Sequence, residues 1–126
     1  MLAYSTIGTN DMPRARKFYE ALFAELGAKS MFEMPDGGFV TYGVDPQKPM
    51  FAIAKPYNGD DAAPGNGNMV AIAAKDPAQV KALYKKAISL GATCEGEAGP
   101  RMDGAMSCGY VRDLDGNKLN FFCMGS

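Results

Sequence analysis

The chain has 126 residues, of which 47% are apolar and 21% charged, and its formal net charge at pH 7 is −1. This is the size and composition of one ordinary globular domain, long enough to bury a core. Lys and Arg are scattered along the chain, so no basic face for nucleic acid is predicted. No apolar run approaches the ~20 residues that span a bilayer, and the first residues do not resemble a signal peptide.

Two residue counts restrict the chemistry further. The three cysteines include no C-x-x-C pair, so we expect free thiols and a cytoplasmic protein rather than a disulfide framework. There is no histidine at all. This excludes Ser-His-Asp triads, Cys-His dyads and metal sites that need imidazole. Any catalysis must therefore use carboxylates, Tyr, Lys, Cys or backbone groups.

The first part of the chain predicts a strand, a helix and three strands. A β-like run at 3–9 precedes a helix in which Asp11 caps the first amides, Pro13 occupies the first turn and Gly27 ends the last turn. Strands are expected at 29–33, 39–44 and 50–55. The apolar residues of this helix recur at steps of three and four, as a stripe of Ala15, Phe18, Tyr19, Leu22, Phe23 and Leu26.

The second part predicts the same order again after a Gly- and Pro-rich linker at 56–68. A strand at 69–74 leads to a helix that Asp76 caps and Gly91 ends. Strands follow at 93–97, 107–112 and 118–123, the last two joined by an Asp-Gly hairpin at 113–117. The apolar stripe of this helix consists of Val80, Leu83, Tyr84, Ala87 and Ile88.

The two halves match each other in sequence, which indicates that one supersecondary unit is used twice. The displacement is 65 positions, as in the step from Asp11 to Asp76. The matched set is Ile7, Asp11, Tyr19 and Phe23 with Ile72, Asp76, Tyr84 and Ile88.

This order resembles the vicinal oxygen chelate superfamily, which includes glyoxalase I, bleomycin-resistance proteins and extradiol dioxygenases. The resemblance covers essentially the whole chain and is carried by 10–12 running into 15–19 and by the closing stretch 109–119. It implies an α+β fold of two βαβββ modules that form a curved mixed sheet around a shared cavity. One domain, 1–126, would then contain module one at about 1–57, a linker at about 58–67 and module two at about 68–126. The resemblance also implies a homodimer, which exposed strand edges would favour.

The resemblance further implies where metal-using relatives place their ligands. Those positions fall on Tyr4, near Ala54, on Met69 and on Asn120. A phenol, a methyl group, a thioether and an amide are poor ligands for a catalytic divalent metal. We therefore predict no metal site and no other cofactor, and direct transfer of glyoxalase I or dioxygenase activity is weakened.

Six residues are candidates for binding a small-molecule ligand. Tyr4 and Thr6 lie on the first strand, where Tyr4 either contacts a ligand or packs as an aromatic at a strand edge. Asn120 is an inward amide that either binds a ligand or joins a structural network. Met69 and Phe122 supply apolar walls, although plain core packing also explains them. Arg101 lies in a predicted Gly-rich loop, 99–104, that resembles the family's lid; it either clamps a carboxylate or phosphate or is a solvated charge.

Three functions remain open from the sequence. The first is a metal-free binder of a small organic molecule. The second is an enzyme, either a lyase or isomerase working through Tyr4 or Glu33 or a metal enzyme with an unrecognised site. The third is a structural or interaction protein whose cavity is filled by Met and Phe side chains. An open cavity with converging polar groups favours the first two, and a filled one favours the third.

Overall fold

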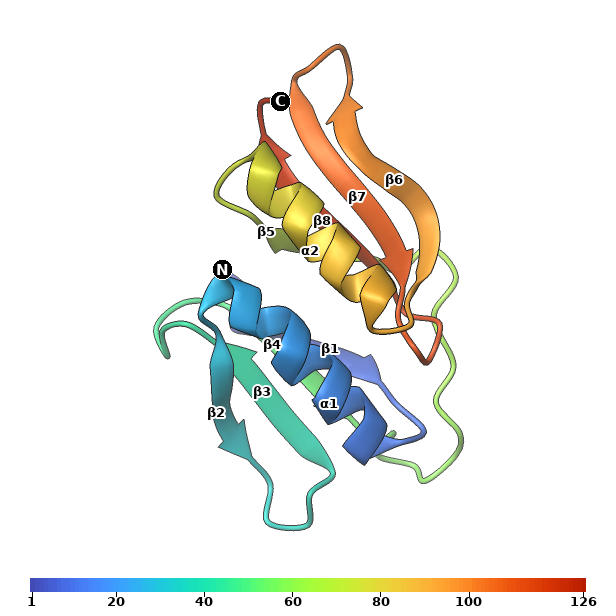
Figure 1. The fold of residues 1–126 in the computed structure, drawn as a ribbon. Coiled ribbons are helices and arrows are strands. Elements are labelled where there is room, and N and C mark those ends of the chain that lie inside the picture. Colours follow the sequence, from blue (N-terminus) through green and yellow to red (C-terminus); the bar gives the residue numbers. More distant parts are fainter. The chain divides into compact units, whose positions relative to one another are not determined.

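The computed structural model describes residues 1–126. The chain divides into two compact units, Met1–Pro64 and Gly65–Ser126. Each unit contains one α-helix and four strands in the same order (Figure 1). Neither helix is long and apolar enough to cross a membrane.

The first unit is a strand, a helix and three strands, as its sequence predicts. Its elements are β1 (Tyr4–Gly8), α1 (Met12–Phe23), a 3-10 turn (Ala24–Leu26), β2 (Lys29–Glu33), β3 (Phe39–Gly43) and β4 (Met50–Ala54). The sheet order is β1-β4-β3-β2. The β1–β4 pair is parallel and the other two pairs are antiparallel, so the sheet is mixed.

The second unit repeats this topology. Its elements are β5 (Val70–Ala73), α2 (Pro77–Ser89), β6 (Thr93–Arg101), β7 (Met106–Arg112) and β8 (Lys118–Met124). The sheet order is β5-β8-β7-β6, with β5 parallel to β8. The predicted α+β fold of two βαβββ modules is confirmed, and hydrogen bonding divides the strands into one four-stranded sheet per module.

Both helices begin where the sequence predicts, but α1 ends at Phe23 and a 3-10 turn continues to Leu26, just before Gly27. Asp11 Oδ1 accepts from the backbone N–H of Arg14 at 3.0 Å, and Asp76 Oδ1 accepts from that of Gln79 at 2.8 Å. Gly27 and Gly91 adopt φ of 69° and 105° after the helices, the left-handed region that favours glycine.

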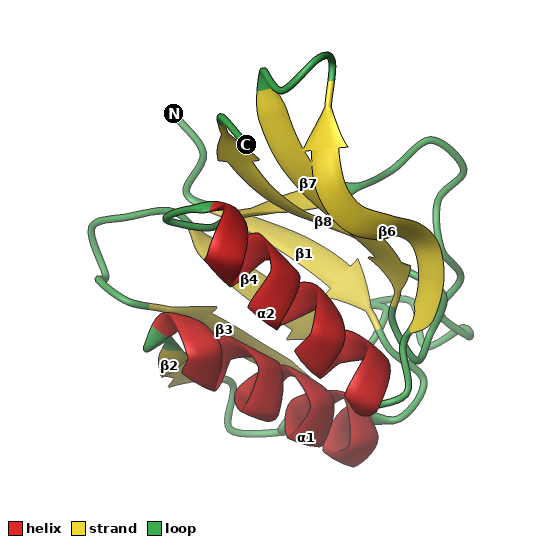
Figure 2. Ribbon diagram, turned by 45° about the horizontal axis from the view of Figure 1, so that its top comes forward, coloured by secondary structure: helices red, strands yellow, loops and turns green.

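The core of the first unit is an aromatic layer between α1 and the sheet. The ring centroids of Tyr19 and Phe51 are 4.8 Å apart, and Phe23 lies 5.1 Å from Phe51 and 5.7 Å from Tyr42. Figure 1 shows each helix against one face of its own sheet, and Figure 2 distinguishes the helices from the strands by colour. Because side chains alternate along a strand, the neighbours of Phe51 and Tyr42 point to the opposite face.

The core of the second unit likewise lies between the helix and the sheet of that unit, but it consists of smaller residues. Leu83 of α2 and Leu119 and Phe121 of β8 are fully buried. Gly109 of β7 leaves room for the helix, since a Cβ there would lie 3.2 Å from the Cβ of Tyr84. Gly109 therefore faces α2, and the residues on either side of it face away.

The third strand of this unit corrects one prediction. The loop expected at 99–104 is wrong in its first half, because β6 continues through Arg101 and pairs with β7 up to Met106. The pairing of β6 with β7 shifts in register between Cys94 and Gly96 and again between Gly96 and Gly99. Pro100 is tolerated because β6 is an edge strand, where a missing N–H breaks no ladder. The turn itself occupies 102–105.

Candidate functional site

The face of the first sheet opposite α1, called here the cavity face, presents a row of side chains from all four strands. The strand register places Thr6, Ala52, Thr41 and Phe32 side by side across it. Phe32 reaches this face through an irregularity in β2, where the register shifts between Ser30 and Phe32. A shift of one residue moves a side chain to the other face of a strand, so the bulge turns Phe32 away from α1.

Three aromatic rings meet on the cavity face without joining the core. The ring of Phe39 lies 5.7 Å from that of Tyr4 and 6.4 Å from that of Phe32, both in edge-on arrangements. Tyr4 is 50% exposed and Phe32 is 54% exposed. Large apolar side chains grouped at a surface are typical of a binding site.

These rings form part of a cavity of about 860 Å³. Small-molecule sites commonly enclose roughly 300–1,000 Å³ and combine apolar walls with a few polar groups. The lining residues all belong to the first unit: Tyr4, Thr6, Ile7, Gly8, Phe32, Met34, Asp36, Gly38, Phe39, Ala54, Lys55, Pro56 and Tyr57.

Polar groups lie at the edge of the cavity, and some of them hold its walls. The Asp36 carboxylate accepts from the Gly38 N–H at 2.9 Å, and the Lys55 N–H donates to the Gly38 carbonyl at 2.9 Å. These bonds join the turn before β3 to the end of β4. Thr6, Lys55 and the tyrosines Tyr4 and Tyr57 are exposed lining residues whose polar groups are available to a ligand.

A second pair of bonds fixes the segment that follows β4. Asn10 Nδ2 donates to the Ala62 carbonyl at 3.0 Å, and the Ala62 N–H donates back to Asn10 Oδ1 at 2.6 Å. Gly8 makes this approach possible, because a Cβ there would lie 3.0 Å from that of Ala62. The chain that carries Tyr57 along the cavity wall is thereby tied to the start of α1.

Glu33, a candidate catalytic residue, lies outside the cavity lining. Its carboxylate accepts from Arg16 Nη1 at 3.0 Å, while Arg16 Nε donates to Glu20 at 2.9 Å and the Tyr42 hydroxyl donates to Glu20 at 2.8 Å. Burial alone would raise the pKa of Glu20, but the hydrogen bonds from Arg16 and Tyr42 outweigh it and lower that pKa. Burial and the bond to Glu20 raise the pKa of Tyr42. The cluster joins α1 to the sheet edge.

The other four ligand candidates belong to the second unit. Met69 is exposed directly before β5, and Phe122 is half-buried on β8 opposite Cys108 of β7. Asn120 is 5% exposed, and its Oδ1 has no hydrogen-bond partner. Arg101 lies at the end of β6 rather than in a lid loop.

The positions where metal-using relatives place their ligands do not fit a divalent ion. Ala54 lines the cavity with a methyl group, and the Asn120 amide is the only carbonyl-type oxygen among the four positions. No group of three or more His, Cys, Asp or Glu side chains is arranged to hold a metal ion.

Of the residues predicted from the sequence to bind a ligand, the structure places Tyr4 and Thr6 in the cavity lining, together with several residues that were not predicted. Phe32, Met34, Phe39, Lys55 and Tyr57 were not predicted to contact a ligand. For Phe39 a signal exists, since it alternates with Val40 and Tyr42 along β3 and must face away from the helix.

Comparison with known proteins agrees with this architecture. The family model described as Glyoxalase/Bleomycin resistance protein/Dioxygenase superfamily matches residues 2–121. The chain belongs to this superfamily. No curated protein matches its sequence significantly.

Solved structures of the superfamily show the same fold. A glyoxalase/bleomycin resistance protein from Albidiferax ferrireducens is 32% identical, with a TM-score of 0.86 and 97% of both chains covered. A glyoxalase-related enzyme from Fulvimarina pelagi is 20% identical, with a TM-score of 0.73 and coverage of 100% of this chain and 95% of the other. A lactoylglutathione lyase from Agrobacterium tumefaciens is 20% identical, with a TM-score of 0.69 and coverage of 97% and 92%. Because the last two structures are only 20% identical to this chain, they show a similarity of fold alone.

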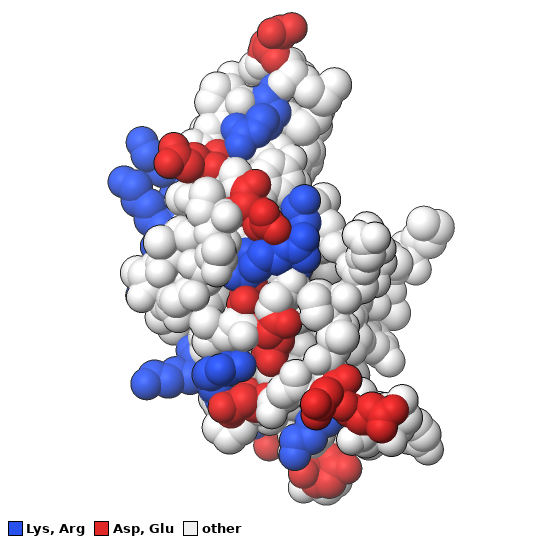
Figure 3. Space-filling model, turned by 90° about the vertical axis from the view of Figure 1, so that its right-hand side faces the viewer, with Lys and Arg blue, Asp and Glu red and all other residues white.

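On the face displayed in Figure 3, Lys and Arg side chains are interspersed with Asp and Glu.

Proposed function

We propose that this protein binds a small organic molecule, without a metal, in the cavity of its first unit. The observation that carries the proposal is the cavity itself, about 860 Å³ with exposed aromatic rings on its walls. A cavity filled by its own Met and Phe side chains would have supported a structural role instead.

The lining supports a ligand with an apolar or aromatic body. Tyr4, Phe32 and Phe39 offer ring faces and edges, and such contacts favour another ring at 4.5–7 Å. A ligand that buries roughly 100 Å² of apolar surface against them gains about 2.5 kcal/mol. Thr6 and Lys55 would then orient its polar end.

The lining gives less support to a lyase or isomerase. Asp36 is the carboxylate among the lining residues, and it already accepts a hydrogen bond from the Gly38 amide. Glu33 is paired with Arg16. Tyr4 remains the one predicted catalytic side chain that reaches the cavity, so binding is the better-supported activity.

The test is a thermal-shift screen of metal-stripped protein against aromatic and aliphatic metabolites, followed by titration of the strongest compound. Phe32→Ala should weaken its binding by about tenfold or more. Val44→Ala removes a side chain of similar exposure that does not line the cavity, so it should leave the affinity unchanged. Equal affinity in the wild type and in Phe32→Ala would overturn the site assignment.

We further propose a cytoplasmic homodimer. Free Cys94, Cys108 and Cys123 suit a reducing compartment. The edge strands of both sheets offer unpaired backbone groups for pairing with a second copy. Size-exclusion chromatography with light scattering should give twice the chain mass of 13.4 kDa, and a monomer at all concentrations would contradict this.

A further inference from the structure

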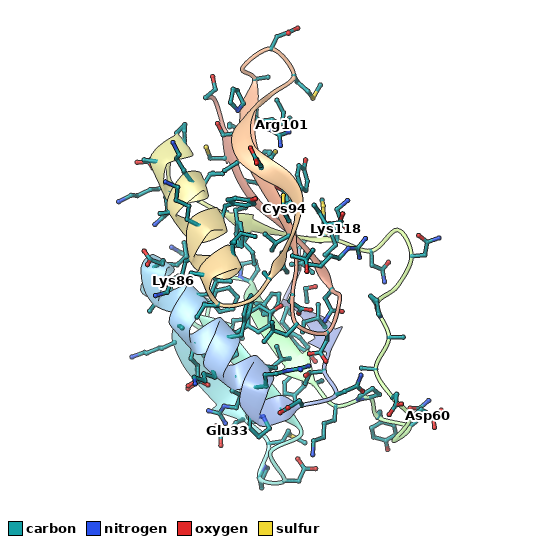
Figure 4. All side chains as sticks on the ribbon, turned by 45° about the vertical axis from the view of Figure 1, so that its right-hand side comes forward. Glu33, Asp60, Lys86, Cys94, Arg101 and Lys118 are labelled. Atoms are coloured by element: carbon teal, nitrogen blue, oxygen red, sulfur yellow. The ribbon has the colours of Figure 1, made fainter.

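The face of the second sheet opposite α2 gathers cations around one aromatic ring. Tyr110 follows Gly109 on β7 and therefore points away from α2. Lys118 Nζ lies 5.4 Å from the centroid of the Tyr110 ring, and Arg101 Cζ lies 5.7 Å from it. Figure 4 shows Arg101 and Lys118 on the side of the sheet away from α2. Each of the two cations therefore lies within cation–π distance of the same ring.

Arg101 is held in place by the backbone of its own strand. Its Nη1 donates to the carbonyls of Gly99 and Pro100 at 3.1 Å each, and its Nη2 donates to that of Glu97 at 2.7 Å. These bonds leave Nε–H and one Nη2–H for another acceptor. Gly96 provides the space, since a Cβ there would lie 3.0 Å from the Tyr110 ring and 3.5 Å from Arg101 Nη2.

The charges on this face are only partly compensated. Arg112 forms an ion pair with Glu95, and Lys118 also helps to lower the pKa of that carboxyl, so one carboxylate faces two cations. Neither Arg101 nor Lys118 has a carboxylate partner among the ion pairs of the protein. The hydrogen bond to Cys108, followed by burial, raises the pKa of Tyr110, so its phenol stays neutral at pH 7 and adds no negative charge.

A buried acceptor lies beside these cations. Asn120 is the register partner of Tyr110 and is separated from Lys118 by one residue on β8, so all three side chains share one face. Asn120 Oδ1 has no donor, although the side chain is nine-tenths buried. Buried polar atoms without partners are rare and need an explanation.

We propose that Arg101, Lys118 and Asn120 bind a small carboxylate that carries a hydroxyl on the neighbouring carbon. The two cations take the carboxylate, and Asn120 Oδ1 accepts the hydrogen bond from the hydroxyl. Lys118 and Asn120 lie two positions apart on β8, roughly 7 Å along the strand, and the long Lys118 side chain can bridge this span to such a ligand. This site lies wholly in the second unit and does not rest on the function proposed for the first.

The test uses glycolate, with acetate as the analogue that lacks the hydroxyl. The full-length protein is titrated with each at constant ionic strength and followed by two-dimensional amide NMR. Glycolate should give saturable shifts at the amides of Tyr110, Lys118 and Asn120, and acetate should bind about tenfold more weakly. Lys118→Gln should weaken glycolate binding by about tenfold, since it removes a charged partner. Lys81→Gln makes the same charge change on the exposed side of α2 and should have no effect.

Two further variants separate binding from folding. Asn120→Leu should abolish the preference for glycolate over acetate while raising Tm, because the unpaired buried oxygen is removed; Asn120→Ala serves the same comparison if the leucine does not fit. Phe32→Ala should bind glycolate as the wild type does. A failure of the cavity proposed in the first unit can therefore be distinguished from a failure of the carboxylate site in the second unit. Glycolate shifts that do not saturate, or equal affinity in Lys118→Gln, would overturn the proposal.

Discussion

Replacing Thr41 with valine is expected to stabilise the protein. Thr41 lies on β3 with 3% of its surface exposed, and its Oγ1 has no hydrogen-bond partner. Valine has the same shape without the hydroxyl, so the change removes a buried group that folding separates from water. Leaving such a group unpaired costs about 1–3 kcal/mol.

The expected effect is large enough to measure by calorimetry or urea unfolding. The unfolding entropy of a chain of 126 residues is about 0.26 kcal/mol per degree, so 1 kcal/mol corresponds to roughly 4 °C in Tm. Thr93→Val, at an exposed strand position, controls for the higher strand propensity of valine and should change stability by less than about 0.5 kcal/mol. An unchanged or lower Tm in Thr41→Val would show that the hydroxyl is satisfied in solution.

Three other changes have definite outcomes. Glu20→Gln should lower Tm at pH 7, because the pKa of Glu20 is lower in the folded than in the unfolded state and its carboxylate therefore stabilises the fold above about pH 4.5. The difference in stability from wild type should be at most about 1 kcal/mol for this exposed group and should vanish as the pH falls to about 2. A difference that does not depend on pH would refute the reasoning. Leu83→Ala in the fully buried face of α2 should cost about 2–5 kcal/mol in urea unfolding, whereas a loss below about 1 kcal/mol would show that α2 packs loosely. Asn10→Ala removes both bonds to Ala62 and should accelerate proteolysis between 55 and 64; an unchanged cleavage rate would show that this segment is held by other contacts.

The fold was predictable because its signals are local and occur twice. Helix boundaries depend on caps and apolar spacing, and Asp11 and Asp76 carry the same signal 65 positions apart. Alternation along β8 likewise predicts which residues face α2, with Leu119 and Phe121 buried against the helix.

The candidate site was less predictable because it depends on register. A uniform alternation from Ser30 would place Phe32 on the same face as Ser30, whereas the irregularity in β2 places it on the cavity face. The extension of β6 through Pro100 to Arg101 depends in the same way on bulges, which composition alone does not locate. The position of Tyr4 and Thr6 on the cavity face was predictable because β1 is regular.

The measurement that most directly tests metal-free binding in the first unit is a thermal-shift comparison of metal-stripped protein with divalent metals and with small metabolites. A compound at about 100 times its Kd should stabilise the protein by about 2.7 kcal/mol. For this chain length that corresponds to roughly 10 °C in Tm. Stabilisation by an apolar or aromatic metabolite, lost in Phe32→Ala and unaffected by Ni, Zn, Mn or Fe, is the predicted result. Stabilisation by one of these metals, or dependence of metabolite binding on it, would contradict it.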